Sequence, residues 1–239
     1  MSSRWPGRRL LGAMLALCAP TWLVLCGFTS AVTPMPVRRE LLTPYLAGLE
    51  ARSVGDVDGR AFGEPARASG APVPLEGVSV VLVPFAAEVE AQLDSIKTHA
   101  RDSLTTYAGA YADVTAVRVG YERELLSAGG GELVRGGVSD SSGVVRLVGL
   151  PAGEWLLLAW REESHAAKGG KAAPKDMNRY RDIPVMTGYA AVSYWRMRVS
   201  VVPGTVTPVT LSDRAIWLTA VREERSHVGD VGTAPKKQR

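Results

Sequence analysis

The chain has 239 residues, of which 46% are hydrophobic and 22% are charged, and its formal net charge at pH 7 is +4. This length and apolar content are sufficient for one sizeable hydrophobic core. The net charge falls to +1 when Arg4, Arg8 and Arg9, which precede a long apolar run, are left out. A net charge this close to zero argues against nucleic acid or an anionic membrane as the partner.

Residues 1–31 have the layout of a secretory signal peptide. The three arginines are followed by an uncharged apolar run from Leu10 to Phe28, and residues 29–31 are small enough for a cleavage site. The run also reaches the length of a membrane-spanning helix, about 17–25 residues. An uncleaved N-terminal membrane anchor is therefore the alternative, and both predict that the rest of the chain is extracytoplasmic, either periplasmic or secreted.

Residues 32–56 are rich in proline, glycine and alanine and are predicted to form an irregular leader, with a short helix around residues 38–52. The main domain is expected to span residues 57–222. A first strand is predicted near residues 58–63, and a second over residues 77–84, where valine and leucine occupy both faces.

Residues 86–126 interrupt the strand pattern. They contain no proline, and their apolar or small residues recur at spacings of four and three, as on one stripe of a helix. We predict one amphipathic helix or a hairpin of two, with the break at Gly109 or Gly120. The residues of the stripe are Val89, Leu93, Ile96, Ala100, Ser103, Tyr107, Ala110, Val114, Val117 and Tyr121.

Two roles for this helical insertion are open. It either folds back and buries its stripe on the sheet, or it forms a coiled-coil-like arm that pairs with a second copy or with another protein of the cell envelope. Tyrosine is enriched at protein interfaces, so Tyr107, Tyr111 and Tyr121 are the candidate contacts with a partner.

Residues 136–162 organise the rest of the fold. Two apolar runs, 144–150 and 154–160, are separated by Pro151, Ala152 and Gly153, and a turn signal from Asp140 to Gly143 precedes them. This order predicts a β-hairpin at the centre of the domain. The second run is apolar on both faces, which is typical of a central strand.

The pattern Ser139-Asp140-x-x-Gly143, then Leu150-Pro151-x-Gly153-x-Trp155-x-Leu157, resembles the consensus of carboxypeptidase regulatory-like (prealbumin-like) domains, and residues 70–80 are similar to the second strand of that family. The resemblance implies an Ig-like β-sandwich of about seven strands, in a family of mostly non-catalytic binding or spacing modules. The helical insertion stands between the expected second and third strands, where the family has a short connection. This departure puts any function carried over from the family in doubt.

The last third of the chain is predicted to begin with a charged surface loop, residues 161–182. A half-buried strand with one polar face follows around Tyr194, and residues 205–211 and 215–221 are expected to close the domain as a strand pair. Residues 223–239 have almost no apolar content and predict a disordered tail.

Sequence signals for chemistry are missing. The three histidines, His99, His165 and His227, lie far apart, both cysteines lie within residues 1–31, and no metal-ligand, nucleophile or phosphate-binding motif occurs. We therefore expect no metal, no cofactor and no enzymatic activity.

The sequence indicates a non-catalytic exported β-sandwich module that acts through protein–protein contacts in the cell envelope. The alternative is a carbohydrate- or envelope-binding accessory domain, which would present Tyr180, Tyr189 and Tyr194 on one sheet face. An enzyme with an unrecognised site is a third class, and it would require a deep polar pocket with shifted carboxylates.

Overall fold

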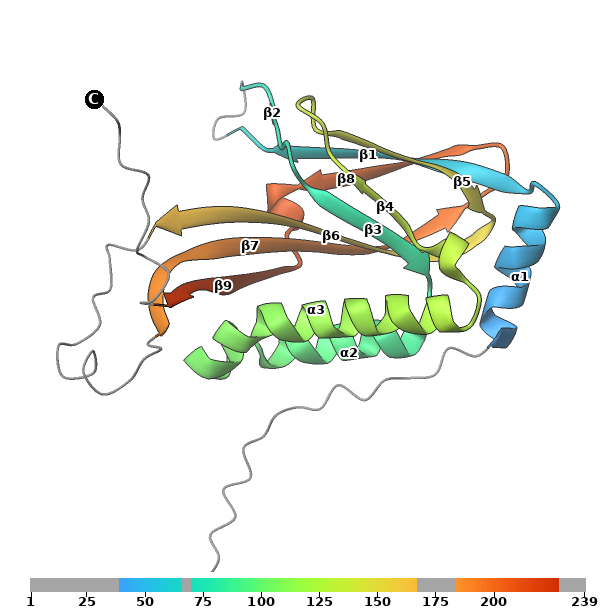
Figure 1. Cartoon of the computed structure of the whole chain (residues 1–239). Coiled ribbons are helices and arrows are strands. Elements are labelled where there is room, and N and C mark those ends of the chain that lie inside the picture. The colour runs from blue at the N-terminus through green and yellow to red at the C-terminus, as the bar shows by residue number, and fades with distance from the viewer. Residues whose placement is uncertain (1–38, 66–69, 167–183, 228–239) are drawn as a thin grey trace, which may run out of the picture. The chain divides into compact units, whose positions relative to one another are not determined.

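The computed structural model describes residues 39–65, 70–166 and 184–227, which form two β-sheets and a layer of two helices (Figure 1). The predicted signal segment 1–31 and the end of the predicted tail, 228–239, lie outside the described residues. In chain order the elements are α1 (Arg39–Glu50), β1 (Val54–Gly63), β2 (Val73–Pro74), β3 (Ser79–Pro84), α2 (Ala87–His99), α3 (Leu104–Ser127), η1 (Gly131–Leu133), β4 (Arg135–Val138), β5 (Val144–Pro151), β6 (Gly153–Ala166), β7 (Pro184–Val201), β8 (Val206–Ser212), η2 (Asp213–Ala215) and β9 (Leu218–His227).

The two sheets pack as the predicted Ig-like β-sandwich. In the first sheet β1 is central and pairs with β2 and β5 antiparallel and with β8 in parallel. The second sheet is antiparallel, in the order β4-β3-β6-β7-β9. Within the described part of the chain this gives nine strands, against the expected seven or so, because β2 and β4 are short additions.

The core lies between the sheets and is closed at one end by α1. Trp155 of β6 is 0% exposed, and its ring lies edge-on to Tyr45 of α1 at a centroid distance of 5.3 Å. The Trp155 indole N–H donates to the Pro151 carbonyl at 3.0 Å, so its one polar group is satisfied. The predicted leader thus contains a helix that joins the core through Leu42 and Tyr45.

The predicted β-hairpin over residues 136–162 is wrong. β5 pairs with β1 in the first sheet, whereas β6 pairs with β3 and β7 in the second, so the turn at 151–153 connects the two layers. The central position of β6 is confirmed. Its two apolar faces are buried against different layers, one against the first sheet and the other against the helices.

The helical insertion is a hairpin of two helices, α2 and α3, which lie side by side on the outer face of the second sheet (Figure 1). Its break lies at residues 100–103, and the prediction of a break at Gly109 or Gly120 is wrong because both glycines lie inside α3. Eight residues of the two helices and of the turn between them join the core, namely Val89, Leu93, Ala100, Ala110, Val114, Val117, Tyr121 and Leu125.

The start of α3 is fixed by a capping box at Ser103. The Ser103 side chain accepts a hydrogen bond from the Thr106 backbone N–H at 3.0 Å, and Thr106 Oγ1 accepts one from the Ser103 backbone N–H at 2.9 Å. This local signal explains why the chain breaks at 100–103 rather than at a glycine.

Replacing Ser103 with alanine is expected to lower the free energy of unfolding by about 1 kcal/mol, because one N-terminal amide of α3 loses its acceptor. Urea unfolding followed by circular dichroism measures the loss. Ser95→Ala, in the interior of α2, is the matched control and should change stability by less; an equal loss in both variants would contradict a capping role.

The strands of the last third are longer than predicted, and they pair differently. β6 runs to Ala166 and β9 runs to His227, so parts of the predicted loop 161–182 and tail 223–239 are strands. The predicted pair of residues 205–211 with 215–221 is also wrong, since β8 pairs with β1 and β9 pairs with β7. The charged side chains of residues 222–225 favoured the prediction of a tail, but strand pairing uses backbone groups, and the backbone of β9 pairs with β7 despite these side chains.

Candidate functional site

The structure buries one of the three tyrosines predicted to contact a partner and leaves the other two as neighbours on α3. Tyr121 is buried, 6% exposed, and its hydroxyl donates to the Pro84 carbonyl at 2.9 Å. Burial raises its pKa, so it stays a neutral donor inside the protein. Tyr111 is partly buried beside Glu162, and Tyr107 lies one turn earlier on α3. The three therefore do not form one surface cluster.

Arginines hold the helical layer to the second sheet. Four guanidinium groups lie over aromatic rings, at 3.9–5.9 Å from the ring centroids. Such contacts combine cation–π attraction with the burial of long side chains. Two of the pairs, Arg118 with Trp160 and Arg222 with Tyr111, join α3 to the second sheet. The other two, Arg196 with Trp217 and Arg198 with Phe85, contain no helical residue, but the same two arginines form ion pairs with Asp94 and Glu90 of α2.

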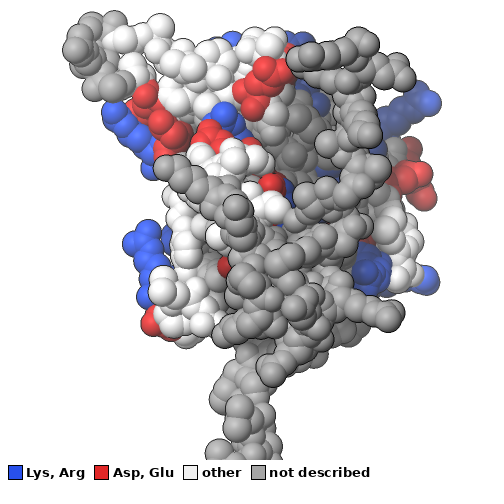
Figure 2. Space-filling model, turned by 60° about the vertical axis from the view of Figure 1, so that its left-hand side comes forward, with Lys and Arg blue, Asp and Glu red and all other residues white. Residues whose placement is uncertain are grey.

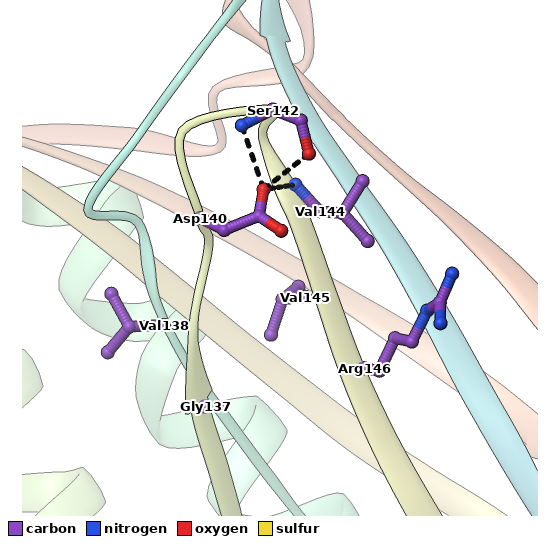
Figure 3. A pocket seen from close by; sticks show the side chains of 7 residues that line it. All are labelled: Gly137, Val138, Asp140, Ser142, Val144, Val145 and Arg146. Atoms are coloured by element: carbon purple, nitrogen blue, oxygen red, sulfur yellow. Dashed lines mark hydrogen bonds between the residues drawn. The ribbon is translucent and has the colours of Figure 1, made fainter.

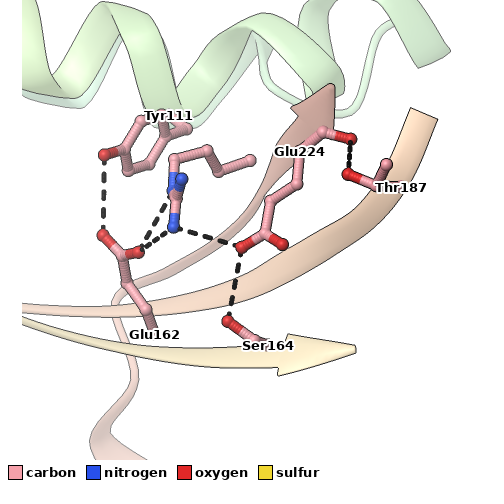
Figure 4. A network of polar contacts seen from close by, with 6 residues as sticks. Tyr111, Glu162, Ser164, Thr187 and Glu224 are labelled. Atoms are coloured by element: carbon pink, nitrogen blue, oxygen red, sulfur yellow. Dashed lines mark hydrogen bonds and ion pairs between the residues drawn. The ribbon is translucent and has the colours of Figure 1, made fainter. Parts of the chain in front are cut away.

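A polar network closes this interface near the start of α3 (Figure 4). Arg222 of β9 donates to Glu162 of β6 through Nε at 3.1 Å and Nη2 at 2.8 Å, and lies 3.5 Å from Glu224. The hydrogen bond to Glu162 raises the pKa of Arg222, so this arginine is always charged. Because each charged group has its partner within the molecule, we assign the network to attachment of α3.

Charges of both signs are interspersed elsewhere on the described surface, as Figure 2 shows for one face. Arg161 pairs with Glu163 at 2.6 Å, and Arg225 pairs with Glu223 at 2.5 Å. Exposed pairs of this kind add little to stability.

The predicted face of aromatic residues for carbohydrate binding is wrong in part. Tyr194 is buried, 3% exposed, while Tyr189 is 38% exposed and stacks on His165 at 5.0 Å. Tyr180 lies outside the described residues. Tyr194 and Tyr189 lie on opposite faces of β7, since they are five residues apart.

A groove lies where β4 and β5 run along the same side of the sandwich (Figure 3). It has a volume of about 420 Å³ and is lined by Gly137, Val138, Asp140, Ser142, Val144, Val145 and Arg146. A Cβ atom on Gly137 would lie 2.9 Å from Val145 Cγ2, so glycine allows the two sheets to approach here. The groove is the candidate functional site of the described part.

The turn at one end of the groove is built by Ser139, Asp140 and Gly143. Ser139 is buried, and its hydroxyl donates to the Leu75 carbonyl at 2.7 Å and accepts from the Val78 N–H at 2.9 Å. Gly143 has φ +75°, and a Cβ there would lie 2.2 Å from the Ala61 carbonyl oxygen. The predicted turn is therefore confirmed, and only glycine fits its last position.

Asp140 is the carboxylate of the groove. One oxygen, Oδ1, accepts hydrogen bonds from the Ser142 hydroxyl at 2.6 Å, the Ser142 N–H at 2.8 Å and the Val144 N–H at 3.0 Å (Figure 3). These bonds, above all the one from the Ser142 hydroxyl, lower the pKa of Asp140. The group is ionised at neutral pH, which suits binding of a cation better than proton transfer.

Acid is expected to weaken the fold through Asp140. Its folded-state pKa lies below the unfolded value of about 3.9, so its stabilising effect is complete above that value and is lost as the pH falls through the folded-state pKa. Urea midpoints measured between pH 7 and pH 2 should therefore fall more steeply below about pH 4 for the wild type than for Asp140→Asn. Parallel curves for the two proteins would refute this role.

The sequence identified the turn but missed the groove. Two consecutive glycines, Gly136 and Gly137, lie within β4, and glycine inside a strand marks places where backbones approach closely. That signal could have indicated the site, although β4 is too short to be recognised by its alternation.

The described residues contain neither a group of metal ligands nor a helix that could cross a membrane. Among residues 39–65, 70–166 and 184–227, no three histidine, cysteine or acidic side chains are grouped as metal ligands. Within the same ranges no helix has the length and apolar character needed to cross a bilayer.

Comparison with known proteins gives only distant similarities. No family model matches the chain, and no curated protein matches it. A proposed carbohydrate-binding protein of Pseudomonas aeruginosa is 16% identical with a TM-score of 0.35, over 67% of this chain and 88% of that one. A minor pilin of Streptococcus agalactiae is 14% identical with a TM-score of 0.27, over 67% of this chain and 44% of the pilin. The pilus backbone protein of Streptococcus pneumoniae is 12% identical with a TM-score of 0.25, over 66% of this chain and 40% of that protein. Similarities at this level assign neither a family nor a function, and the resemblance to carboxypeptidase regulatory-like domains stays a prediction.

Proposed function

We propose that the chain is an exported, non-catalytic β-sandwich module that acts through contacts with another protein in the cell envelope. Export follows from the signal layout of residues 1–31. The binding role is supported by the groove between β4 and β5, whose lining consists of three valines, one glycine, one serine, one aspartate and one arginine.

The chemistry of the groove supports contact rather than catalysis. Asp140 has a lowered pKa, whereas a general acid or base needs a pKa near the working pH. The other charged residue of the lining, Arg146, interacts with Asp58 at 3.4 Å. The aliphatic side chains and free backbone groups that remain are the contacts that proteins use to bind one another.

The apolar stripe of the helical insertion is not the contact in this proposal. Most residues of that stripe belong to the core, so a partner would have to unfold the layer to reach them. Carbohydrate binding ranks second, since the described residues supply one exposed candidate tyrosine, Tyr189.

Photo-crosslinking in the producing cell tests the proposal. A photoreactive amino acid is placed in the full chain at one of three exposed positions, Leu104, Val138 or Tyr189, which are 88%, 62% and 38% exposed. We expect a protein adduct in the extracytoplasmic fraction from at least one position. A chain that stays in the cytosol, or that gives no protein adduct from any position, would overturn the proposed function.

A further inference from the structure

The free edges of the two sheets differ in how they are protected against pairing with another strand. Sheet edges in soluble proteins are usually kept short, charged or interrupted by proline. β4 has four residues, β8 carries Pro208 in its middle, and β9 carries charged residues from Arg222 to Arg225 that pair within the molecule.

β5 is the edge with the least protection. It has eight residues, one charge and no proline before its last position, Pro151. Its only irregularity is a bulge near Gly149, which has φ +68°. Among the described strands β5 pairs with β1 alone.

The hydrogen bonds of the turn show which backbone groups of β5 are free. Val144 points away from β1, because its N–H donates to Asp140 Oδ1 and its carbonyl accepts from the Asp140 N–H at 3.0 Å. Backbone groups in an antiparallel pair alternate in direction along the strand. The N–H and C=O groups of Arg146 therefore also point away from β1, toward the free edge. Those of Val148, at the bulge, do so as well, because the next N–H, that of Gly149, turns toward β1 and donates to Asp56 Oδ1 at 2.9 Å.

The groove lies beside these free groups. Val145 and Gly137 lie deep in it, and Val138 at its rim is 62% exposed. Val148, further along β5, is 65% exposed. A strand added to β5 would alternate its side chains, so every second one would face the groove and meet an apolar surface.

The negative charge of Asp140 indicates which side chains of a partner the groove would favour. Asp140 stands at the end of the groove, and one of its two oxygens, Oδ2, has no hydrogen-bond partner among the described residues. The arginine of the lining, Arg146, is paired with Asp58 at 3.4 Å, which leaves Asp140 as the unpaired charge of the groove. A basic side chain of a partner would be attracted to it.

We propose that the free edge of β5 binds an extended segment of a partner protein as an added strand, with an apolar side chain in the groove and a basic residue beside Asp140. This inference rests on the proposed function and names the site and the kind of segment that it binds. An added strand gains main-chain hydrogen bonds at Arg146 and Val148, while the groove selects its side chains.

The test uses two capped synthetic peptides, Lys-Val-Thr-Val-Thr-Val-Lys and the same sequence with glutamate at both ends, with the full chain. We expect the lysine peptide to slow hydrogen exchange at the Arg146 and Val148 amides, as read by NMR, and to bind about fivefold more tightly than the glutamate peptide, the upper range for one exposed ion pair. Asp140→Asn should remove that preference.

Val148→Pro deletes one outward N–H and is expected to weaken binding of the lysine peptide at least tenfold, roughly the loss of one or two main-chain hydrogen bonds. Thr210→Pro is the matched control. It places a second proline on β8, two residues after Pro208, and should leave binding unchanged. The exchange measurement on the wild type needs no variant, so the test stands even where a proline variant fails to fold.

Three results would overturn the inference. The first is no hydrogen-exchange protection of the Arg146 and Val148 amides at millimolar peptide. The second is protection of amides on the edges of β4, β8 or β9 instead. The third is a dimeric chain in which the Arg146 and Val148 amides are already protected without peptide, which would identify a second copy as the occupant. A protein adduct obtained from Leu104 or Tyr189 would leave the proposed function intact in the first two cases.

Discussion

A chain in which a short glycine–serine loop replaces residues 86–126 is expected to unfold or aggregate rather than to form a folded monomer. Helices α2 and α3 contribute eight core residues with their connecting turn, and a large buried aliphatic side chain contributes about 1.5–3 kcal/mol. Removing the five valines and leucines among them costs an amount comparable with the whole 5–15 kcal/mol by which domains are typically stable. The replacement would also expose Leu156, Leu158 and Val192 of the second sheet, which are now buried.

Light scattering and circular dichroism of the two proteins measure this outcome. Leu104→Ala is the matched control within the insertion, because Leu104 is 88% exposed and its truncation should leave stability nearly unchanged. A folded, monomeric loop variant beside a dimeric wild type would show that the helices form an association arm, contrary to the packing described.

Trp155→Ala is expected to cost about 3–5 kcal/mol of unfolding free energy, the usual loss for a large aromatic residue removed from a core. The ring is fully buried on the central strand β6, contacts Tyr45 of α1 edge-on, and satisfies its N–H at Pro151. Its loss would leave a cavity where both sheets and α1 meet. Urea unfolding gives the value.

Trp160→Ala is the control for this substitution, on the same strand. Trp160 faces the helices, is partly exposed and stacks on Arg118 at 4.6 Å, so its removal should cost clearly less than that of Trp155. Equal losses would mean that the helix–sheet interface is packed as tightly as the interior of the sandwich.

The position of the helices directs the search for partners. The sequence left open whether the stripe of the insertion is packed inside or binds another protein, and the structure buries it against the second sheet. The contact surface must then lie elsewhere, and the side of the sandwich formed by β4 and β5 has both free backbone groups and the groove. Partner searches should start from that side.

The candidate site was predictable only in part. The Asp140–Gly143 turn has a local cause, since an aspartate caps the backbone two residues on and glycine tolerates a positive φ. For the groove the sequence offers only the Gly136–Gly137 pair as a local signal, because the groove itself depends on the approach of β4 to β5 across two different sheets. No pattern along the chain reports the distance between Gly137 and Val145.

Residue patterns along the chain were enough to predict the Ig-like sandwich class, the amphipathic insertion, the turn at Asp140 and the central position of β6. Only the tertiary structure decided which strands pair. Neighbours in sequence predicted β5 with β6 and β8 with β9, but each of these strands found its partner in another part of the chain. Strand pairing is set by burial of both faces of each sheet at once, and the helices cover one of those faces, so it depends on contacts between residues far apart in the chain.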